Sequence, residues 1–408
     1  MTKGPFCDIL VCLLVLTIGM KIAMIGQKGI PALHGGIERH VHELSLALTA
    51  RGFDVLAYGR KWYTNREDGM FEGIELVHVR TLHTKHLDAI LSTFFATIDA
   101  IRRRVDVIHY HGVGPSLLSW IPRIFAPHIL VVSTFHSIDR KHQKWGPFAR
   151  FTLRLGEWAA CHFSHRSIAV SRTIYQYMRD VYDTESFYIP NAVPAYEPIL
   201  DESVMAEWNL LPKEYVLVVS RLIPHKGIHY IVDAWKQLLQ KNPAAIGNKK
   251  LVIVGDGYYT DEYVDFVKSR AANIPSIVFT GFKSGSTLHT LYSQASFMIH
   301  PSDNEGLPIC VLEGMSYRLP LLLSDIVEHK DLIENKNFFF QRGDISSLVE
   351  KLEFVFSQSK EALVLEGQKN RAVIEREFEW GKVIDKIIAV YQTVVVKTKV
   401  QSLPVETH

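Results

Sequence analysis

Two glutamates, Glu305 and Glu313, have the spacing that most directly suggests chemistry in this chain. Glu305 lies in turn-forming residues, 301–306, that follow an apolar strand, and Glu313 lies in a short helix that Pro308 can open. Glu313 is five residues past Pro308, which is about 7 Å along a helix. The two carboxylates therefore cannot hold one small group. They can hold opposite ends of a long ligand, with a phosphate at the free N–H groups of the helix start.

The alternative is that both glutamates are ordinary surface groups, as most exposed helical glutamates are. A basic loop elsewhere in the chain argues against this. Arg221 and Lys226 follow the apolar strand 215–219, and Gly227 allows the helix 228–239 to start close to them. Open α/β sheets bind ligands at the carboxyl ends of their strands. Arginine can hold phosphate oxygens in a bidentate manner and lysine adds a mobile charge, so this loop predicts a diphosphate site rather than two solvated cations.

A third loop, Gly255-Asp256-Gly257, follows the strand 251–254. It is only part of a dinucleotide-binding fingerprint, because the third glycine and the later acidic residue are absent. It nevertheless fits a nucleotide that lies over the edge of the sheet.

The chain alternates apolar strands with helices in two blocks, which predicts two parallel sheets with right-handed crossovers. We expect the first strands at 21–26, 53–58, 74–79, 105–109, 129–134, 166–170 and 186–189, and the second at 215–219, 250–254, 277–280, 296–300 and 320–323. A proline-bounded linker, from 188 to about 211, separates the blocks. At 408 residues the chain is long enough for two domains with separate cores.

Together these motifs resemble family four of the glycosyltransferases, the retaining GT-B enzymes that use nucleotide sugars. The resemblance runs from Met20 to about Gln392 and includes the Glu-x7-Glu element, the Arg/Lys pair, a glycine-rich loop at Gly35-Gly36 and a strand-end histidine, His136. The segment 21–31 is similar to a bacterial branch that acts on surface polysaccharides and includes rhamnosyltransferases. The implied fold is α/β GT-B, with two Rossmann-like parallel-sheet domains facing an interdomain cleft.

The resemblance also implies roles for single residues. Glu313 would hold the ribose, Glu305 would orient the donor sugar, and Arg221 and Lys226 would carry the charge of the departing diphosphate. The residues expected in catalysis are Arg221, Lys226, Glu305 and His136, and those expected to bind the nucleotide sugar are Glu313, Gly35, Gly36, Gly306, Leu307, Gly255 and Gly257. The implied domains are 1–19, a leader or upstream extension; 20–195, the acceptor side; 196–380, the donor side; and 381–408, a helix returning to the first domain.

Histidines and glycines of the first block have other readings. Gly35 and Gly36 can form a plain tight turn, or a helix start that approaches the donor phosphate. His136 can hydrogen-bond a sugar hydroxyl, neutral or charged. His109 and His111 lie on one side of a strand and are assigned to the acceptor side. The pair has no third ligand, so zinc is not expected.

Composition is that of a globular protein, with 47% hydrophobic and 22% charged residues. A net charge of +2 does not favour nucleic acid as a partner. The four cysteines, Cys7, Cys12, Cys161 and Cys310, have no metal-binding spacing and suit a reduced, cytoplasmic location. No Asp-x-Asp pair is present, so we expect neither a metal nor another cofactor, and protein groups would neutralise the diphosphate.

Two segments combine cations with apolar side chains. Between 140 and 172, seven Lys/Arg and one acid, Glu157, are mixed with Trp145, Phe148, Phe151, Leu155 and Trp158. This pattern favours either a helix that lies on a membrane carrying a lipid-linked acceptor, or a helix that packs its aromatics into the core. We read 87–104, where seven large apolar residues recur at helical spacing, mainly as a core helix: Leu87, Ile90, Leu91, Phe94, Phe95, Ile98 and Ile101.

The apolar run 9–18 is too short to span a bilayer comfortably, and Met20 is the expected true start. We therefore predict a glycosyltransferase that is cytoplasmic or peripheral at the inner membrane surface. Its donor would be a nucleotide diphosphate sugar, and its acceptor a glycan or polyprenyl-linked glycan of surface polysaccharide synthesis. The alternatives are a hydrolase, a nucleotide-sugar epimerase of the same fold, and a non-catalytic sugar-binding scaffold.

Overall fold

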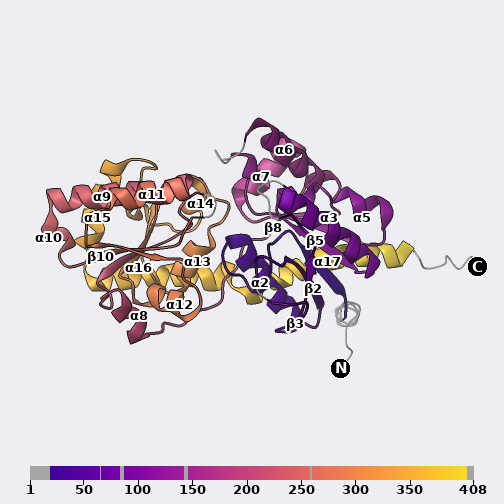
Figure 1. Ribbon diagram of the computed structural model, residues 1–408, viewed down its shortest axis with the longest axis horizontal. Helices are drawn as coiled ribbons and strands as arrows, with labels where there is room; N and C mark the ends of the chain where they lie inside the picture. Colours follow the sequence, from indigo (N-terminus) through magenta and orange to yellow (C-terminus); the bar gives the residue numbers. More distant parts are fainter. Residues whose placement is uncertain (1–18, 65, 83–86, 142–145, 258–259, 402–408) are drawn as a thin grey trace, which may run out of the picture. The chain divides into compact units, whose positions relative to one another are not determined.

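The computed structural model describes residues 19–64, 66–82, 87–141, 146–257 and 260–401. The chain forms two compact units (Figure 1): unit 1 is Met1–Asn191 with Trp380–His408, and unit 2 is Ala192–Glu379. The expected leader lies outside the described residues apart from Gly19, as do Cys7, Cys12, His142, Lys144 and Trp145.

Unit 1 is built on an eight-stranded sheet in the order β3-β4-β2-β1-β5-β6-β7-β8. All neighbours are parallel except β3, which pairs antiparallel with β4. The strands are β1 (Lys21–Ile25), β2 (Asp54–Arg60), β3 (Gly69–Phe71), β4 (Ile74–Val79), β5 (Val107–His111), β6 (Leu130–Phe135), β7 (Arg166–Ala169) and β8 (Phe187–Tyr188). The inner strands β1, β5 and β6 are buried along nearly their whole length, as expected for a parallel sheet covered on both faces.

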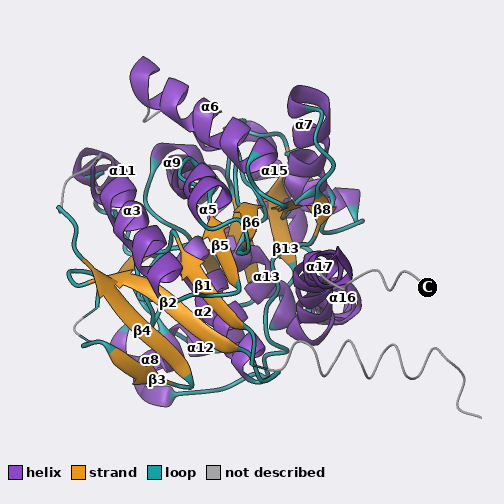
Figure 2. Cartoon of the chain, turned by 90° about the vertical axis from the view of Figure 1, so that its right-hand side faces the viewer, coloured by secondary structure: helices purple, strands orange, loops and turns teal. Residues whose placement is uncertain are grey.

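Helices cover both faces of this sheet (Figure 2). They are α2 (Gly36–Thr49), α3 (Leu87–Arg102), α4 (Val113–Ser116), α5 (Trp120–Phe125), α6 (Pro147–His162), α7 (Arg172–Tyr182) and α17 (Trp380–Gln401). Right-handed crossovers place α3, α5, α6 and α7 on one face and α2 on the other, where α17 contacts it. The C-terminal helix thus completes unit 1 although it follows all of unit 2 in the sequence.

Unit 2 has a six-stranded parallel sheet in the order β11-β10-β9-β12-β13-β14. The strands are β9 (Tyr215–Val219), β10 (Lys250–Val254), β11 (Ile277–Gly281), β12 (Phe297–His300), β13 (Leu321–Ser324) and β14 (Phe339–Phe340). Its helices are α8 (Glu202–Glu207), α9 (Ile228–Lys241), α10 (Pro243–Ile246), α11 (Asp261–Arg270), α12 (Gly285–Gln294), α13 (Ile309–Ser316), α14 (Val327–Lys330), α15 (Ile345–Phe356) and α16 (Lys360–Val373). Both units therefore have the doubly wound architecture expected from the sequence.

The expected core role of α3 is wrong for its largest side chains. Leu87, Phe94 and Phe95 are exposed, whereas the buried positions are mostly small or polar: Asp88, Ser92, Thr93, Ala96, Thr97 and Ala100. Small side chains allow the helix to lie close to the sheet. There Asp88 forms a buried ion pair with Arg60 at 3.0 Å, and Thr97 hydrogen-bonds Tyr110 at 2.9 Å.

Helix α6 is arranged in the same way. Its buried residues are Gly156, Glu157, Ala159, Ala160 and Cys161, while its aromatic side chains face outward. The carboxylate of Glu157 accepts hydrogen bonds from Tyr177, Tyr182 and Arg140, at 2.7, 2.6 and 3.1 Å. Arg140 is thus part of the interior packing. The core-packing interpretation of the aromatic residues of α6 is wrong.

Candidate active site

The three ligand loops expected in unit 2 lie at one edge of its sheet. They follow β9, β10 and β12, which are adjacent parallel strands. The strand order reverses between β9 and β12, since the chain continues from β9 to β10 on one side and returns to β12 on the other. Such a reversal is where open α/β sheets bind their ligands. The loop that carries Lys226 and the loop that carries Glu305 flank this point.

Backbone contacts hold the three loops together. Asp303 N donates to His225 O at 2.8 Å, and Leu222 N donates to Asp256 O at 3.0 Å. Two glycines make this close approach possible. A Cβ on Gly227, whose φ is +66°, would lie 2.1 Å from Pro301 O, and a Cβ on Gly255 would lie 1.8 Å from Ser220 O. The loops are thus held in place by backbone contacts with one another.

Lys226 and Glu305 form an ion pair with each other. Both side chains are largely buried, and the fully buried His300 at the end of β12 adds a hydrogen bond of 2.8 Å from Nε2 to Glu305 Oε1. The structure therefore brings together two of the residues expected in catalysis. It adds His300, which sequence reasoning did not identify although it lies five residues before Glu305.

Charge is stabilised within this triad. Burial would raise the pKa of Glu305, but Lys226 and His300 outweigh it and hold that pKa well below its usual range. Burial would lower the pKa of His300, but Cys310 and Glu305 raise it to about 9. Glu305 is therefore a carboxylate at neutral pH, and His300 carries a proton. A carboxylate held ionised in this way can accept hydrogen bonds from sugar hydroxyls, but it is poorly suited to donate a proton.

Glu313 belongs to a separate network. It lies on α13, is largely buried, and accepts a hydrogen bond of 3.0 Å from Tyr292 Oη on α12. Burial and the neighbouring Glu313 raise the pKa of Tyr292 well above its usual value, so Tyr292 remains a donor. Pro308 precedes α13 as its N-cap residue. The two glutamates thus have different partners, as expected from their spacing.

The remaining residues expected in unit 2 have various environments. Arg221 is exposed and forms no ion pair with any residue that the structure describes. Gly306 and Leu307 are buried in the turn before α13. A Cβ on Gly257 would lie 2.6 Å from Val264 Cγ2, so a larger residue there would clash. Arg221 can therefore meet an anionic ligand without first leaving a carboxylate partner.

In unit 1 the expected glycines lie at the start of α2. Gly35 is the N-cap residue, with φ of +107°, and Gly36 is the first residue of the helix. Glu38, in the first turn of the helix, accepts a hydrogen bond from Lys28 N at 3.3 Å. The Gly-Gly pair therefore does open a helix, and that helix follows the loop after β1.

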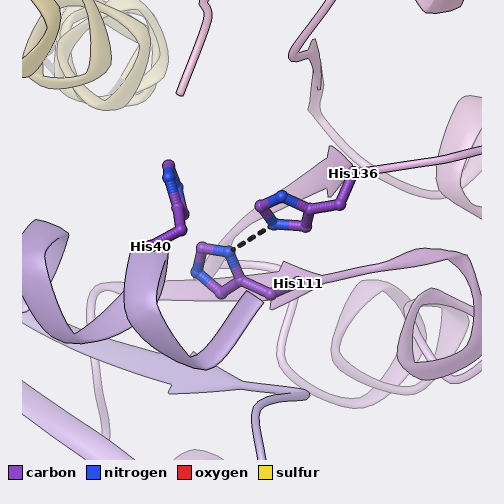
Figure 3. A group of neighbouring side chains, drawn as sticks. All are labelled: His40, His111 and His136. Carbon is purple, nitrogen blue, oxygen red and sulfur yellow. Dashed lines mark hydrogen bonds between the residues drawn. The ribbon is translucent and has the colours of Figure 1, made fainter. Parts of the chain in front are cut away.

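His136 follows β6 and lies beside His111, at the end of β5, and His40 on α2 (Figure 3). All three side chains are buried. Burial lowers the pKa of His136 and His111 well below the usual value and that of His40 to about 4. His136 is thus neutral at pH 7, and its charged form is not available there. Sequence reasoning missed His40, since nothing in its helical context distinguishes it.

His109 does not face an acceptor. It is fully buried, with Nδ1 2.8 Å from Tyr391 Oη on α17 and Nε2 2.7 Å from Thr134 Oγ1. Both ring nitrogens are therefore engaged within unit 1, and its expected acceptor role is wrong. His109 and His111 do lie on one side of β5, with ring centroids 4.1 Å apart.

Two family models match the chain. One, described as glycosyl transferases group 1, matches residues 202–372, and the other, described as glycosyltransferase family 4, matches residues 34–195. The first match lies in unit 2, and the second runs from just before α2 through β8 of unit 1. The chain belongs to the GT-B glycosyltransferases.

Similar proteins support the assignment of the chain to the GT-B glycosyltransferases. An uncharacterized glycosyltransferase of Methanocaldococcus jannaschii is 23% identical over 91% of the chain and 98% of its own length. The UDP-Gal:alpha-D-GlcNAc-diphosphoundecaprenol alpha-1,3-galactosyltransferase of Escherichia coli is 25% identical over 72% of the chain and 77% of its own length. The solved structure of Anabaena HepE in complex with UDP and glucose shares the fold, with a TM-score of 0.75, 17% identity and coverage of 92% of this chain and all of HepE.

The described part of the chain contains no helix that combines the length and the apolar character needed to cross a bilayer.

Proposed function

We propose that this glycosyltransferase moves a sugar from a nucleotide diphosphate sugar to a hydroxyl of a lipid-linked glycan, with retention of anomeric configuration, in the synthesis of a surface polysaccharide. The observation that carries the donor part is the charge arrangement at the strand reversal of unit 2. An exposed Arg221 and the buried Lys226–Glu305–His300 group lie on loops that the sheet holds in place. The UDP bound by the similar protein HepE is a ligand of the same class.

Unit 2 would hold the donor in an extended form. Arg221 and Lys226 would pair with diphosphate oxygens, Glu305 would orient the sugar, and Glu313 would hold ribose hydroxyls. Tyr292 supports this last role because its hydroxyl positions the Glu313 carboxylate. His300 supports the role of Glu305 in orienting the sugar, since its positive charge would keep Glu305 ionised when Lys226 turns toward a phosphate.

The course of the transfer step is inferred from the resemblance to the retaining family. The acceptor hydroxyl attacks the anomeric carbon on the face from which the diphosphate leaves, the bond between that carbon and the phosphate oxygen breaks, and the diphosphate takes the acceptor proton. Arg221 and Lys226 would neutralise the departing charge without a metal. His136, which is neutral, would hydrogen-bond a donor-sugar hydroxyl.

The acceptor part rests on the exposed face of unit 1. Apolar side chains of three helices on the same side of the sheet are exposed to solvent: Leu87, Phe94 and Phe95 on α3, Trp120, Ile124 and Phe125 on α5, and Phe148, Phe151, Leu155 and Trp158 on α6. Phe148 is 84% exposed and Phe125 is 69% exposed. Soluble proteins rarely expose so many large apolar residues on one face.

Cations accompany this apolar face. Arg150 and Arg154 on α6 are exposed and form no ion pair with any described residue. A groove of about 780 Å³ runs beside them between α6 and α7, lined by Phe151, Leu155, Trp158 and Val181 among others. Apolar side chains that are flanked by arginines suit an anionic membrane surface. The galactosyltransferase relative is named for a diphosphoundecaprenol-linked acceptor, whose lipid part would suit such a surface.

Two experiments test the proposal. A thermal-shift screen of nucleotide sugars, followed by nucleotide release with a lipid-linked acceptor, should give acceptor-dependent release for at least one donor. Conversion of the donor sugar without acceptor would indicate an epimerase instead, and binding without release would indicate a scaffold.

Sedimentation with vesicles containing anionic lipid tests the surface. Phe151→Ser/Trp158→Ser should lower vesicle binding at least tenfold, whereas the matched replacement of exposed Phe266 on unit 2 should not. Equal binding by all three proteins would exclude α6 as the membrane contact.

A further inference from the structure

Three buried histidines of unit 1 converge at the strand reversal of its sheet. Consecutive segments run from β1 to β2 on one side, and from β5 to β6 on the other. His40 comes from α2, which follows β1, His111 ends β5, and His136 follows β6 (Figure 3). One ring nitrogen from each histidine lies within 4.8 Å of the other two. Three imidazoles so close together are a donor set that divalent transition metals prefer.

The distances fit a tetrahedral ion. Zinc binds histidine nitrogens at about 2.0–2.1 Å, so two ligands of a tetrahedron lie about 3.3 Å apart. His111 Nδ1 and His136 Nε2 are 3.3 Å apart. From the widest separation, 4.8 Å, closure to the same spacing needs a movement of roughly 1.5 Å, which a rotation of the His40 side chain can supply. Two of the three donors are thus already placed.

The surroundings of the group also favour metal. All three imidazoles are buried together, and imidazole nitrogens are common ligands of zinc. Nδ1 of His40 is buried without a hydrogen-bond partner among the residues that the structure describes. Such an atom is rare in folded proteins and indicates a missing partner. His111 Nε2 lies 3.4 Å from Met24 Sδ, which leaves Nδ1 as the nitrogen that faces His136.

We propose that His40, His111 and His136 bind one zinc ion, with the fourth position left for water or a ligand oxygen. Three histidines with an open position are an established zinc ligand set. Coordination of zinc would occupy the ring nitrogen of His136 that the donor sugar would otherwise contact. Added zinc should therefore lower the transfer rate and a chelator should restore it, a consequence that, unlike the binding itself, rests on the proposed function.

Binding is tested on the full-length, chelator-treated protein with zinc alone, by calorimetric titration, and with Co²⁺, by its visible absorption. The proposal expects one ion per chain and the intense absorption of tetrahedral cobalt. His40→Gln and His136→Gln should each weaken zinc binding at least ~100-fold, because one of three protein ligands is lost. His109→Gln, beside the site but engaged by Tyr391 and Thr134, and His128→Gln, at an exposed position, should retain it.

Two outcomes of the zinc titration would count against the site. The proposal is overturned if the wild-type protein takes up no stoichiometric zinc, or if His40→Gln and His136→Gln bind it as tightly as His128→Gln. Circular dichroism melting of each variant shows whether it is folded, and a His40→Ala variant replaces any glutamine variant that is not. Zinc titration needs neither a nucleotide sugar nor a glycan acceptor. A failure to bind zinc is therefore distinguishable from a failure of sugar transfer.

Discussion

The protonated His300 gives unit 2 a stability that depends on pH. The pKa of a histidine in an unfolded chain is near 6.5, and that of His300 in the folded protein is raised to about 9. A group with a raised pKa stabilises the fold fully below its unfolded value and loses that effect as the pH rises through its folded value. A pKa raised from 6.5 to about 9 corresponds to about 3 kcal/mol of stability. We expect this contribution to be complete at pH 6 and largely absent above pH 9.5.

The perturbation is His300→Gln, which keeps a hydrogen-bond donor for Glu305 but removes the charge. Calorimetric or urea unfolding of unit 2 should show a wild-type advantage of about 3 kcal/mol at pH 6 that disappears by pH 9.5. His128→Gln, at an exposed site, serves as the matched control and should show no such trend.

A direct reading of the same quantity is available by NMR titration of the His300 ring. A wild-type advantage that is constant from pH 6 to pH 9.5, or an imidazole that titrates near 6.5, would contradict the account of the triad.

Other predictions follow from the same loops. Lys226→Ala should lower kcat more than ~100-fold and cost unit 2 only about 2 kcal/mol of stability, because His300 still neutralises Glu305. Kinetics and thermal melting of one preparation measure both effects. Full activity would exclude Lys226 from binding the diphosphate. Gly227→Ala should destabilise unit 2 by more than ~2 kcal/mol in urea unfolding, since its Cβ would meet Pro301 O at 2.1 Å; a neutral change would refute the close approach. Glu313→Gln should weaken nucleotide binding about tenfold in calorimetry with little change in kcat, and an unchanged affinity would remove Glu313 from the ribose site.

Much of the fold could be predicted because the strands are apolar runs separated by helices. The expected strand 215–219 is the observed β9, and those at 250–254 and 296–300 differ from β10 and β12 by at most one residue. The short edge strands β3 and β14 were not predicted, since two or three residues are too few to show the period of a strand.

The orientations of α3 and α6 could not be read from the sequence. Large apolar residues at helical spacing normally mark the core face, but in both helices small residues such as Ala96 and Ala160 face the sheet. A helical pattern states which residues share a face. It does not state whether that face is buried or exposed to solvent.

The site was predicted where its residues follow strands, as Lys226 and Glu305 do. Their mutual ion pair and the proton on His300 depend on distances between separate loops, which spacing along the chain does not give. His40 was missed for the same reason, because its ring meets those of His111 and His136 only in the folded chain.

The central claim is tested most directly by following radiolabelled sugar from a panel of nucleotide diphosphate sugars onto a lipid-linked glycan acceptor. The account predicts acceptor-dependent label transfer from at least one donor, one nucleotide diphosphate released per sugar transferred, and at least ~100-fold less transfer by Arg221→Ala. It would be contradicted by nucleotide release without label in the acceptor, or by transfer that Arg221→Ala supports at the wild-type rate.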